Sequence, residues 1–283
     1  MPATIDLHCH STISDGLYAP EALVAYAHAQ GVKVMALTDH DDIGGLSVAR
    51  AAAERLGIRF INGVEISVTW KKRTIHIVGL RIDPEYTPLK TALAAVRHGR
   101  LARAKRMAEA LDKVGIPDVF AGAQALAGNS IITRSHIARY LVEAGYVKDV
   151  KTVFKKYLVK GKPGFVDHEW MSLAAAVTLI KDSGGVAVVA HPGRYDLGRT
   201  NMPLLMHQFR SFGGEAIEVV TGSHTPPQYT QFAKIAHQFS LKASLGSDFH
   251  GPGMSYIGMG QIQDLPANCI PVWQGWEEAD CLN

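Results

Sequence analysis

Short apolar or β-branched runs alternate with amphipathic helical patterns along most of the chain. This alternation is typical of βα units that build a parallel sheet. The runs contain few polar positions, as expected of strands that helices cover on both faces. Seven strands are predicted, over Thr4–Leu7, Val32–Leu37, Arg59–Asn62, Thr74–Leu80, Val186–Ala190, Ala216–Val220 and Leu241–Leu245. The fold class is therefore α/β.

Residues typical of helix boundaries lie between these strands. Pro20 begins one helix, which ends before Gly31, and a second runs from about Asp42 to Gly57. Proline in the first turn and glycine just past the end are the usual boundary residues. Ser172 is expected to cap a third helix and Thr225 a fourth.

The alternation breaks between about Pro88 and Asp167. An apolar stripe from Leu101 to Leu111, flanked by basic residues, predicts a helix there. Further helices are predicted over Ile131–Ala144 and Lys148–Leu158. We therefore expect an α/β barrel formed by residues 1–96 and 163–283, and a basic helical insertion, residues 97–162, that forms a substrate-binding cap.

Charge is unevenly distributed along the chain. The insertion contains fourteen Lys and Arg against five Asp and Glu, whereas the remainder contains fifteen against twenty-one. The net charge of +3 therefore hides a basic segment beside an acidic body. This division indicates a cation-binding site next to a surface for polyanions, although two solvated helices would give the same composition.

Composition excludes several classes of protein. With 47% hydrophobic and 19% charged residues, the chain is folded rather than intrinsically disordered. It has neither an apolar run long enough to span a membrane nor a signal-peptide pattern, which predicts a cytoplasmic protein. The three cysteines have no CxxC spacing, which argues against a disulfide framework and against a thiolate zinc site.

Histidines and acidic residues gather where strands are expected to end. Parallel α/β folds bind ligands at the carboxyl ends of their strands, so these side chains should converge. The strand period of two places His8 and His10 on one face. Imidazole and carboxylate ligands suit Mn²⁺, Zn²⁺ or Fe²⁺, and the set is large enough for two or three ions. The residues that gather there are His8, His10 and Asp15; Asp39 and His40; Glu65, after a turn at Gly63; His76, within the fourth strand; His191; Glu218, within the sixth; and Asp248 and His250. Glu218 is expected to stand behind a ligand or to face the substrate, although plain burial in its strand would explain it equally well.

These motifs resemble those of the PHP (polymerase and histidinol phosphatase) metallophosphoesterases. The resemblance spans nearly the whole chain in the family's order, through His8-Cys9-His10 with Asp15-Gly16, Thr38-Asp39-His40, Gly63-Val64-Glu65, His191-Pro192 and Ser247-Asp248-Phe249-His250. It implies a distorted seven-stranded (β/α) barrel with a trinuclear centre. The first ion would take His8, His10, Glu65 and Asp248; the second Glu65, His76 and His191; and the third Asp15, His40 and His250. Some members carry His where Asp15 stands, so this chain departs from them at the third ion. Asp39 is expected to orient a ligand without touching a metal ion.

A second candidate group lies in the insertion. Thr133-Arg134-Ser135-His136 stands at the start of a predicted helix. Arg134, Ser135, His136 and the backbone N–H groups there make a phosphate-binding set, although a capped and exposed helix would have the same sequence. Arg194, three residues after His191, and Tyr18, beside the first ligand loop, are further candidates for binding the substrate.

Within the family, the chain looks most like the branch that includes 3',5'-nucleotide bisphosphate phosphatases and the RNase AM type of 5'-to-3' exonuclease. The resemblance implies hydrolysis of a phosphate monoester of a bisphosphonucleotide by a metal-activated hydroxide, with Mn²⁺ as the first choice of ion. Asp15, His40, His191 and His250 would be the catalytic residues. The alternatives are exonuclease action on short 5'-phosphorylated RNA, histidinol phosphate hydrolysis and a non-catalytic domain. We expect a nucleotide or RNA substrate and neither a membrane nor a protein partner.

Overall fold

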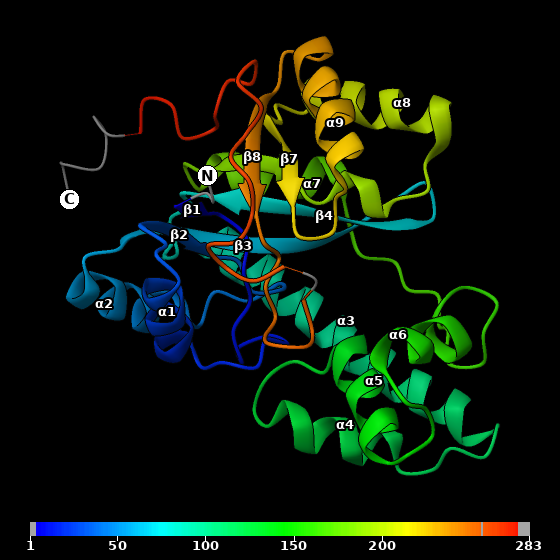
Figure 1. Cartoon of the computed structure of the whole chain (residues 1–283). Helices are drawn as coiled ribbons and strands as arrows, with labels where there is room; N and C mark the ends of the chain where they lie inside the picture. The colour runs from blue at the N-terminus through cyan, green and yellow to red at the C-terminus, as the bar shows by residue number, and fades with distance from the viewer. Residues whose placement is uncertain (1–3, 256, 277–283) are drawn as a thin grey trace.

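Eight strands form one sheet that curls into a nearly closed barrel, which confirms the predicted fold class (Figure 1). The computed structural model describes residues 4–255 and 257–276. The strand order is β1-β2-β3-β4-β6-β7-β8, with the short β5 paired to β3. The strands are β1 (Ile5–Asp6), β2 (Val34–Leu37), β3 (Arg59–Trp70), β4 (Arg73–Leu80), β5 (Met171–Ser172), β6 (Val186–Val189), β7 (Ala216–Thr221) and β8 (Lys242–Gly246).

The first and last strands close the barrel beside the predicted ligands. Leu7 N donates to Leu245 O at 3.1 Å, and the contact continues past both strands, because Asp248 N donates to His8 O at 2.8 Å. Gly246 makes this approach possible, since a Cβ atom added there would lie 2.3 Å from His8 Cβ. The ends of the chain therefore bring their two ligand motifs together.

The prediction of an all-parallel sheet was wrong for β4, which pairs antiparallel with both β3 and β6. β3 continues to Trp70 instead of ending at Asn62, and it forms a hairpin with β4. Gly63 is not a turn; it pairs with Leu80 inside the strand. A glycine is needed there because a Cβ atom would lie 2.7 Å from Thr38 Cγ2. Glu65 thus stands within β3 and not after it. The sequence analysis also missed β5.

Five helices cover the outside of the barrel: α1 (Pro20–Ala29), α2 (Leu46–Leu56), α7 (Leu173–Asp182), α8 (Gly198–Ser211) and α9 (Pro226–Gln238). Both predicted caps are confirmed. Ser172 Oγ accepts from Ala175 N at 3.2 Å, and Thr225 forms a reciprocal capping box with Gln228. α2 begins at Leu46 instead of near Asp42, and α8 was not predicted.

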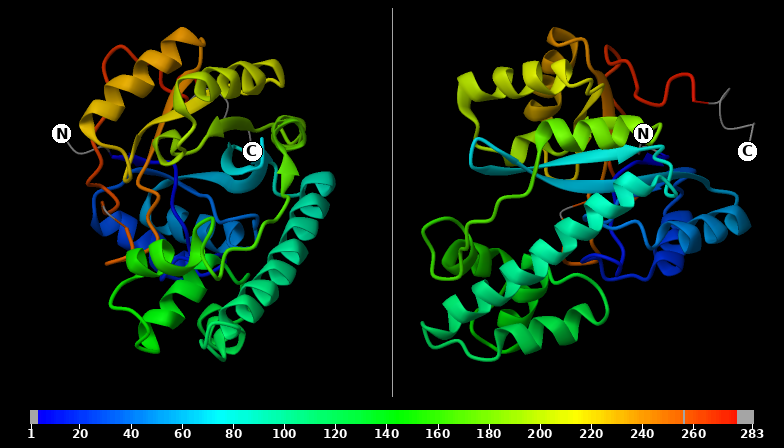
Figure 2. Two further views of the ribbon diagram at one scale, coloured as in Figure 1. Left: turned by 90° about the vertical axis from the view of Figure 1, so that its right-hand side faces the viewer. Right: turned by 180° about the vertical axis from the view of Figure 1, so that it is seen from behind.

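The insertion forms a helical lobe beside the barrel (Figures 1 and 2). It contains α4 (Val119–Ala127), α5 (Arg134–Glu143), α6 (Val150–Val153) and a π-helical turn (Phe154–Leu158), and α4 was not predicted. α3 (Thr87–Asp112) crosses the predicted boundary at residue 97, because its apolar spacing begins earlier in the sequence. Its Leu89 and Leu93 pack in the barrel core, whereas Met107 and Leu111 pack in a separate core within the lobe. One rigid helix thus joins the two cores.

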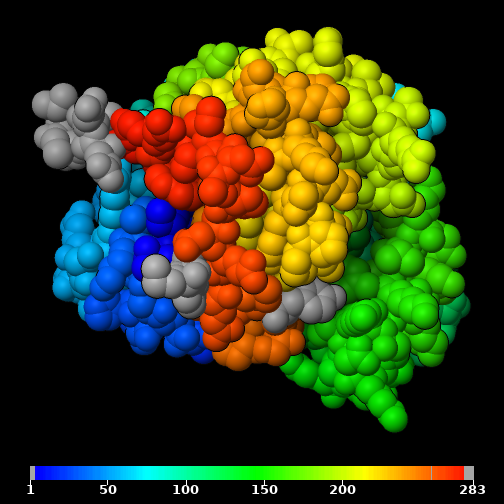
Figure 3. Space-filling model, turned by 45° about the horizontal axis from the view of Figure 1, so that its top comes forward, coloured from blue at the N-terminus to red at the C-terminus, as the bar shows by residue number. Residues whose placement is uncertain are grey.

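The lobe lies next to the carboxyl-terminal loops of the barrel. Figure 3 shows the green residues of the lobe beside yellow and orange residues of the barrel. Across residues 4–255 and 257–276, none of the helices has the combination of length and apolarity that crossing a membrane requires.

Candidate metal centre

The nine predicted ligands converge at one end of the barrel. Loops after β1, β2, β6 and β8 carry seven of them, and the β3–β4 hairpin carries Glu65 and His76. Four overlapping groups have one ligand atom per residue within 4.8 Å of one another. They are His8, His10 and Asp248; His8, Glu65 and His191; His40, Glu65 and His76; and His10, Asp15, His40 and His250. The convergence expected from the sequence is present.

Glu65 lies at the middle of the cluster and is completely buried. Its Oε1 is 2.8 Å from both His76 Nδ1 and His191 Nε2. Burial alone would raise the pKa of Glu65, but the neighbouring imidazoles, His40 first, hold it well below its usual range. Its Oε2 faces three further imidazole nitrogens, at 2.8 Å on His40, 3.4 Å on His10 and 3.5 Å on His8. One carboxylate therefore reaches five imidazoles and is placed to bridge ions.

Asp248 completes the group next to β1. Its Oδ1 lies 3.3 Å from His10 Nε2 and 3.6 Å from His8 Nε2. Burial lowers the pKa of His10 to about 3, so this imidazole is neutral and can offer a lone pair to an ion. His8, His10 and Asp248 thus form one of the four groups, and their assignment to a first ion stays a prediction.

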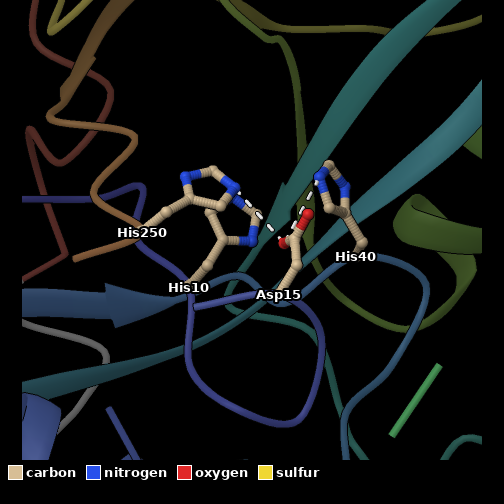
Figure 4. A group of neighbouring side chains, drawn as sticks. All are labelled: His10, Asp15, His40 and His250. Carbon is tan, nitrogen blue, oxygen red and sulfur yellow. Dashed lines mark ion pairs between the residues drawn. The ribbon is translucent and has the colours of Figure 1, made fainter. Parts of the chain in front are cut away.

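Asp15 is buried and lies between the imidazoles of His40 and His250 (Figure 4). Its Oδ1 is 3.3 Å from His250 Nε2 and 3.9 Å from His40 Nε2. Burial opposes protonation of His250, but Asp15 raises the pKa of His250 to about 9. Binding of an ion to this group would therefore release a proton. His10 also belongs to the group, which adds one ligand to the implied third set.

The polar atoms of the cluster fit divalent ions. Among the described residues, buried Asp15 Oδ1, Glu65 Oε2 and Asp248 Oδ1 accept no hydrogen bond. Buried carboxylate oxygens without a partner are costly, and cations held between them would satisfy all three. Every nearby ligand atom is nitrogen or oxygen, as Mn²⁺, Zn²⁺ and Fe²⁺ accept. We conclude that the residues present suit a centre with more than one ion.

Two carboxylates hold the ligands without belonging to the four groups. Glu218 Oε1 lies 2.7 Å from His8 Nδ1, and its Oε2 accepts from His191 N at 2.6 Å. Asp39 accepts from Ser11 N at 2.8 Å and from Ser14 Oγ at 2.6 Å, which fixes the loop between His10 and Asp15. Carboxylates behind a ligand set its tautomer and direction. The contacts of Asp39 agree with the orienting role expected of it.

The phosphate-binding candidates of the insertion lie directly against this cluster. Thr133 caps α5, and its Oγ1 donates to Asp15 Oδ2 at 3.0 Å. His136 is buried, and its Nδ1 accepts from Thr133 N at 3.2 Å. Ser135 N donates to Thr133 Oγ1, and Arg134 Cζ lies 5.5 Å from the Phe154 ring. The start of α5 is thus tied to the third ligand group.

The other two candidates differ in their surroundings. Arg194 Nη1 donates to Asp248 Oδ2 at 2.6 Å, so its guanidinium lies at the edge of the cluster. The Tyr18 ring packs 5.4 Å from Tyr26 and 6.3 Å from Phe249, among the aromatic residues of the barrel. Substrate contact by Arg194 and Tyr18 stays a prediction.

The sequence analysis missed a buried network behind His40. Arg100 donates from Nε and Nη2, at 2.6 Å to Asp41 Oδ2 and at 2.6 Å to Ser67 Oγ. Asp41 Oδ1 accepts from Ser67 N at 2.7 Å, which ties the loop after His40 to β3 and α3. A signal for this network was present in the sequence, because arginines recur at every third position from 97 to 106. Such spacing keeps side chains near one another along a helix.

The barrel and its buried imidazole–carboxylate cluster define a metal-dependent hydrolase. The chain belongs to the PHP domain family, whose model matches residues 6–164, and the expected family is thereby confirmed. Within that family it is a metal-dependent phosphoesterase.

Similarity to individual proteins extends over the whole chain. A 3',5'-nucleoside bisphosphate phosphatase of Chromobacterium violaceum is 49% identical over 276 residues, which are 97% of each chain. The 5'-3' exoribonuclease Rnm of Escherichia coli is 44% identical over 96% of this chain and 94% of its own. A solved structure from Bifidobacterium adolescentis, named as a metal-dependent phosphoesterase, has a TM-score of 0.83 at 27% identity, with 99% of this chain and 97% of its own covered.

Proposed function

We propose that this chain hydrolyses a phosphate monoester of a 3',5'-bisphosphonucleotide, such as adenosine 3',5'-bisphosphate, to yield AMP and phosphate. One observation carries the proposal. The Thr133–Asp15 hydrogen bond joins the metal-ligand cluster to the start of α5, where Arg134 stands. A nucleotide with two phosphates could place one at the metal centre and the other at this guanidinium. The bisphosphate phosphatase relative, 49% identical over 97% of the chain, supports this substrate class.

The metal ligands of this proposal are the nine clustered residues, with Mn²⁺ as the first ion to test before Zn²⁺ and Fe²⁺. Bound divalent ions lower the pKa of a water molecule and draw negative charge from phosphoryl oxygens. Asp15, His40, His191 and His250 would be catalytic through the ions that they hold at the reacting phosphate. Glu218 keeps His8 and His191 in their orientations, and Arg194 places a positive charge beside Asp248.

The insertion would act as the cap of the site. The helical lobe lies next to the metal centre, and its net charge suits a phosphorylated substrate. Residues 97–162 would then hold the part of the nucleotide that does not react, while the barrel holds the reacting phosphate.

Exonuclease action on short 5'-phosphorylated RNA is the second candidate. The basic lobe favours it, since lysines and arginines there could follow a phosphate backbone, and a relative in Escherichia coli is named as a 5'-3' exoribonuclease. Binding of RNA would then weaken steeply with salt concentration. Both reactions need a terminal nucleotide held by its phosphate, so one site could perform both.

The test is phosphate release by metal-stripped protein to which Mn²⁺ has been restored. Adenosine 3',5'-bisphosphate, histidinol phosphate and a short 5'-phosphorylated RNA are compared side by side. We expect rapid turnover of the bisphosphate, and release of mononucleotides from RNA if the second activity is also present. Turnover of histidinol phosphate alone, or of no substrate, would overturn the proposal.

Replacing Arg134 with alanine should impair the bisphosphate selectively. A charge-assisted hydrogen bond contributes about 1.5–3 kcal/mol, which corresponds to a loss of roughly 10- to 150-fold in kcat/KM. Hydrolysis of a simple phosphate ester should change by less than about threefold, because it lacks the second phosphate. Arg139→Ala, on another face of α5, is the matched control. Equal losses on both substrates would show that Arg134 acts on the fold or on the metal centre.

A further inference from the structure

A small cavity lies between the insertion and the barrel, next to the residue that hydrogen-bonds Asp15. Thr133 forms part of its wall, and its volume is about 10 Å³, with one side open to solvent. Its polar lining comes from α3, from the start of α5 and from the segment before α7: Arg100, Arg103, Thr133, Arg134 and Trp170. Three guanidinium groups thus meet in one place, adjacent to the metal-ligand cluster.

Two of these three guanidinium groups lack a carboxylate partner. Arg100 is neutralised by Asp41, at 2.6 Å. Within the part of the chain that the structure describes, no carboxylate forms an ion pair with Arg103 or Arg134, although Asp167 acts on Arg103 and Asp15 on Arg134 from farther away. Arg103 is 9% exposed, and its Nε donates to Val166 O at 3.3 Å. Its two terminal nitrogens form no hydrogen bond within the described residues and are not among the buried polar atoms without a partner, so they reach solvent and are available to an anion.

Burial and mutual repulsion act on both groups. Burial first, and then the charges of Arg134 and Arg100, lower the pKa of Arg103 to about 9. The pKa of Arg134 falls to about 10, first through burial and then through Arg100 and Arg194. An anion between the two guanidiniums would relieve this repulsion.

Trp170 fixes the direction of Arg103 relative to the metal centre. Arg103 Cζ lies 5.4 Å from its ring, and Arg100 Cζ lies 5.0 Å from it. The indole Nε1 donates to Thr74 Oγ1 at 3.2 Å, which ties the ring to the β3–β4 hairpin that carries Glu65 and His76. A planar guanidinium held on an aromatic face is well suited to bind a phosphate through two hydrogen bonds.

We infer that Arg103 and Arg134 form a subsite for the phosphate that is not hydrolysed, with Trp170 holding Arg103 in place. The inference rests on the proposed function and extends it, because it assigns the second phosphate to a cavity lined by α3 as well as α5. The ligand is a phosphate group, either the phosphate of a bisphosphonucleotide that does not react or the 5'-terminal phosphate of a short RNA.

Arg103→Met tests the subsite, with Arg106→Met as its control. Arg106 lies on the same helix and is exposed, so both changes remove the same charge. We expect Arg103→Met to lower kcat/KM for adenosine 3',5'-bisphosphate by about 30-fold, and for 3'-AMP and 5'-AMP by less than about threefold. Arg106→Met should leave all three substrates within about twofold. Equal losses on bisphosphate and monophosphates, or no loss, would overturn the subsite.

A binding experiment separates failure of the subsite from failure of the proposed function. Calorimetry with metal-stripped protein and inorganic phosphate should show binding that Arg103→Met weakens about tenfold and Arg106→Met does not. Absence of binding to the metal-stripped wild-type protein would overturn the subsite even if the bisphosphate is hydrolysed. Binding in a protein that fails to hydrolyse the bisphosphate would support the subsite and overturn the substrate.

A second variant and a second substrate extend the test. Arg103→Lys keeps the charge without the planar fork, so it should retain part of the selectivity and guards against a variant that does not fold. A selective loss with short 5'-phosphorylated RNA instead of the bisphosphate would support the subsite and assign it to the 5'-terminal phosphate of RNA. If Arg103→Met lowers kcat/KM selectively for neither the bisphosphate nor RNA, the subsite is wrong.

Discussion

Replacing Glu65 with glutamine is expected to remove metal ions from the protein together with its phosphoesterase activity. The two oxygens of Glu65 lie within 3.5 Å of nitrogens on five imidazoles, so no other carboxylate described here reaches as much of the cluster. Glutamine keeps the shape but removes the charge that a bridging ligand supplies. We expect kcat/KM to fall by on the order of 10³-fold or more, because the loss affects both the activation of water and the stabilisation of charge on the phosphate.

Metal content measured by mass spectrometry separates this cause from misfolding. The Glu65→Gln variant should bind at least one metal ion fewer per chain than the wild-type protein. Its circular dichroism spectrum should be unchanged. Glu54→Gln is the matched control, since Glu54 is exposed on α2. If Glu65→Gln kept the full number of ions and its activity, the placing of Glu65 at the middle of the centre would be wrong.

The ligand cluster was predictable because its signals are local. His8 and His10 are two residues apart at a strand end, and Asp248 and His250 repeat the same spacing at the last strand. A parallel barrel then brings such ends together whatever their separation in sequence. The structure confirms the convergence. The β3–β4 hairpin places His76 beside Glu65, and His40 lies at the same carboxylate. The assignment of residues to individual ions stays a prediction.

The hairpin was not predicted because the glycine at position 63 is compatible with two structures, a turn and a strand that lies close to its neighbour. Glycine at the end of an apolar run usually indicates a turn. Here it serves the close approach of β2 and β3, where Thr38 leaves no room for a side chain. Local pattern cannot distinguish the two cases, since the contact that requires glycine comes from another strand.

Contacts between the insertion and the barrel were beyond sequence reasoning for a similar reason. Thr133 and Asp15 are 118 positions apart, and Arg100 and Ser67 are 33 apart. From the sequence alone, Thr133 is compatible with an ordinary helix cap, and Arg100 with a solvated basic residue. Only the path of α3, which begins in the barrel core and ends in the core of the lobe, brings these partners together. The charge division did indicate that a basic segment lies beside an acidic centre, but not which arginines face it.

Arg100→Met should lower the free energy of unfolding more than replacement of Arg55, Arg103 or Arg106 by methionine. The ion pair of Arg100 with Asp41 is buried, with side-chain exposures of 8% and 0%. Removing one partner of such a pair leaves an uncompensated charge in the interior, which costs about 3–5 kcal/mol of the free energy of unfolding. Asp41 also lies next to His40 and has a left-handed backbone, with φ of 50°. Loss of Arg100 should therefore loosen the loop that carries a metal ligand.

Urea denaturation of metal-stripped protein measures this effect without the contribution of bound ions. Arg55→Met is the control, because Arg55 pairs with Glu21 at the same distance of 2.6 Å but with exposures of 60% and 64%. Water and salt screen that pair, so its loss should cost less than about 1 kcal/mol. The double variant Asp41→Asn with Arg100→Met should recover part of the stability lost by Arg100→Met alone, since it leaves no buried charge. A loss with Arg100→Met no larger than with Arg55→Met would mean that water reaches Asp41, and that α3 is not held to the barrel by this ion pair.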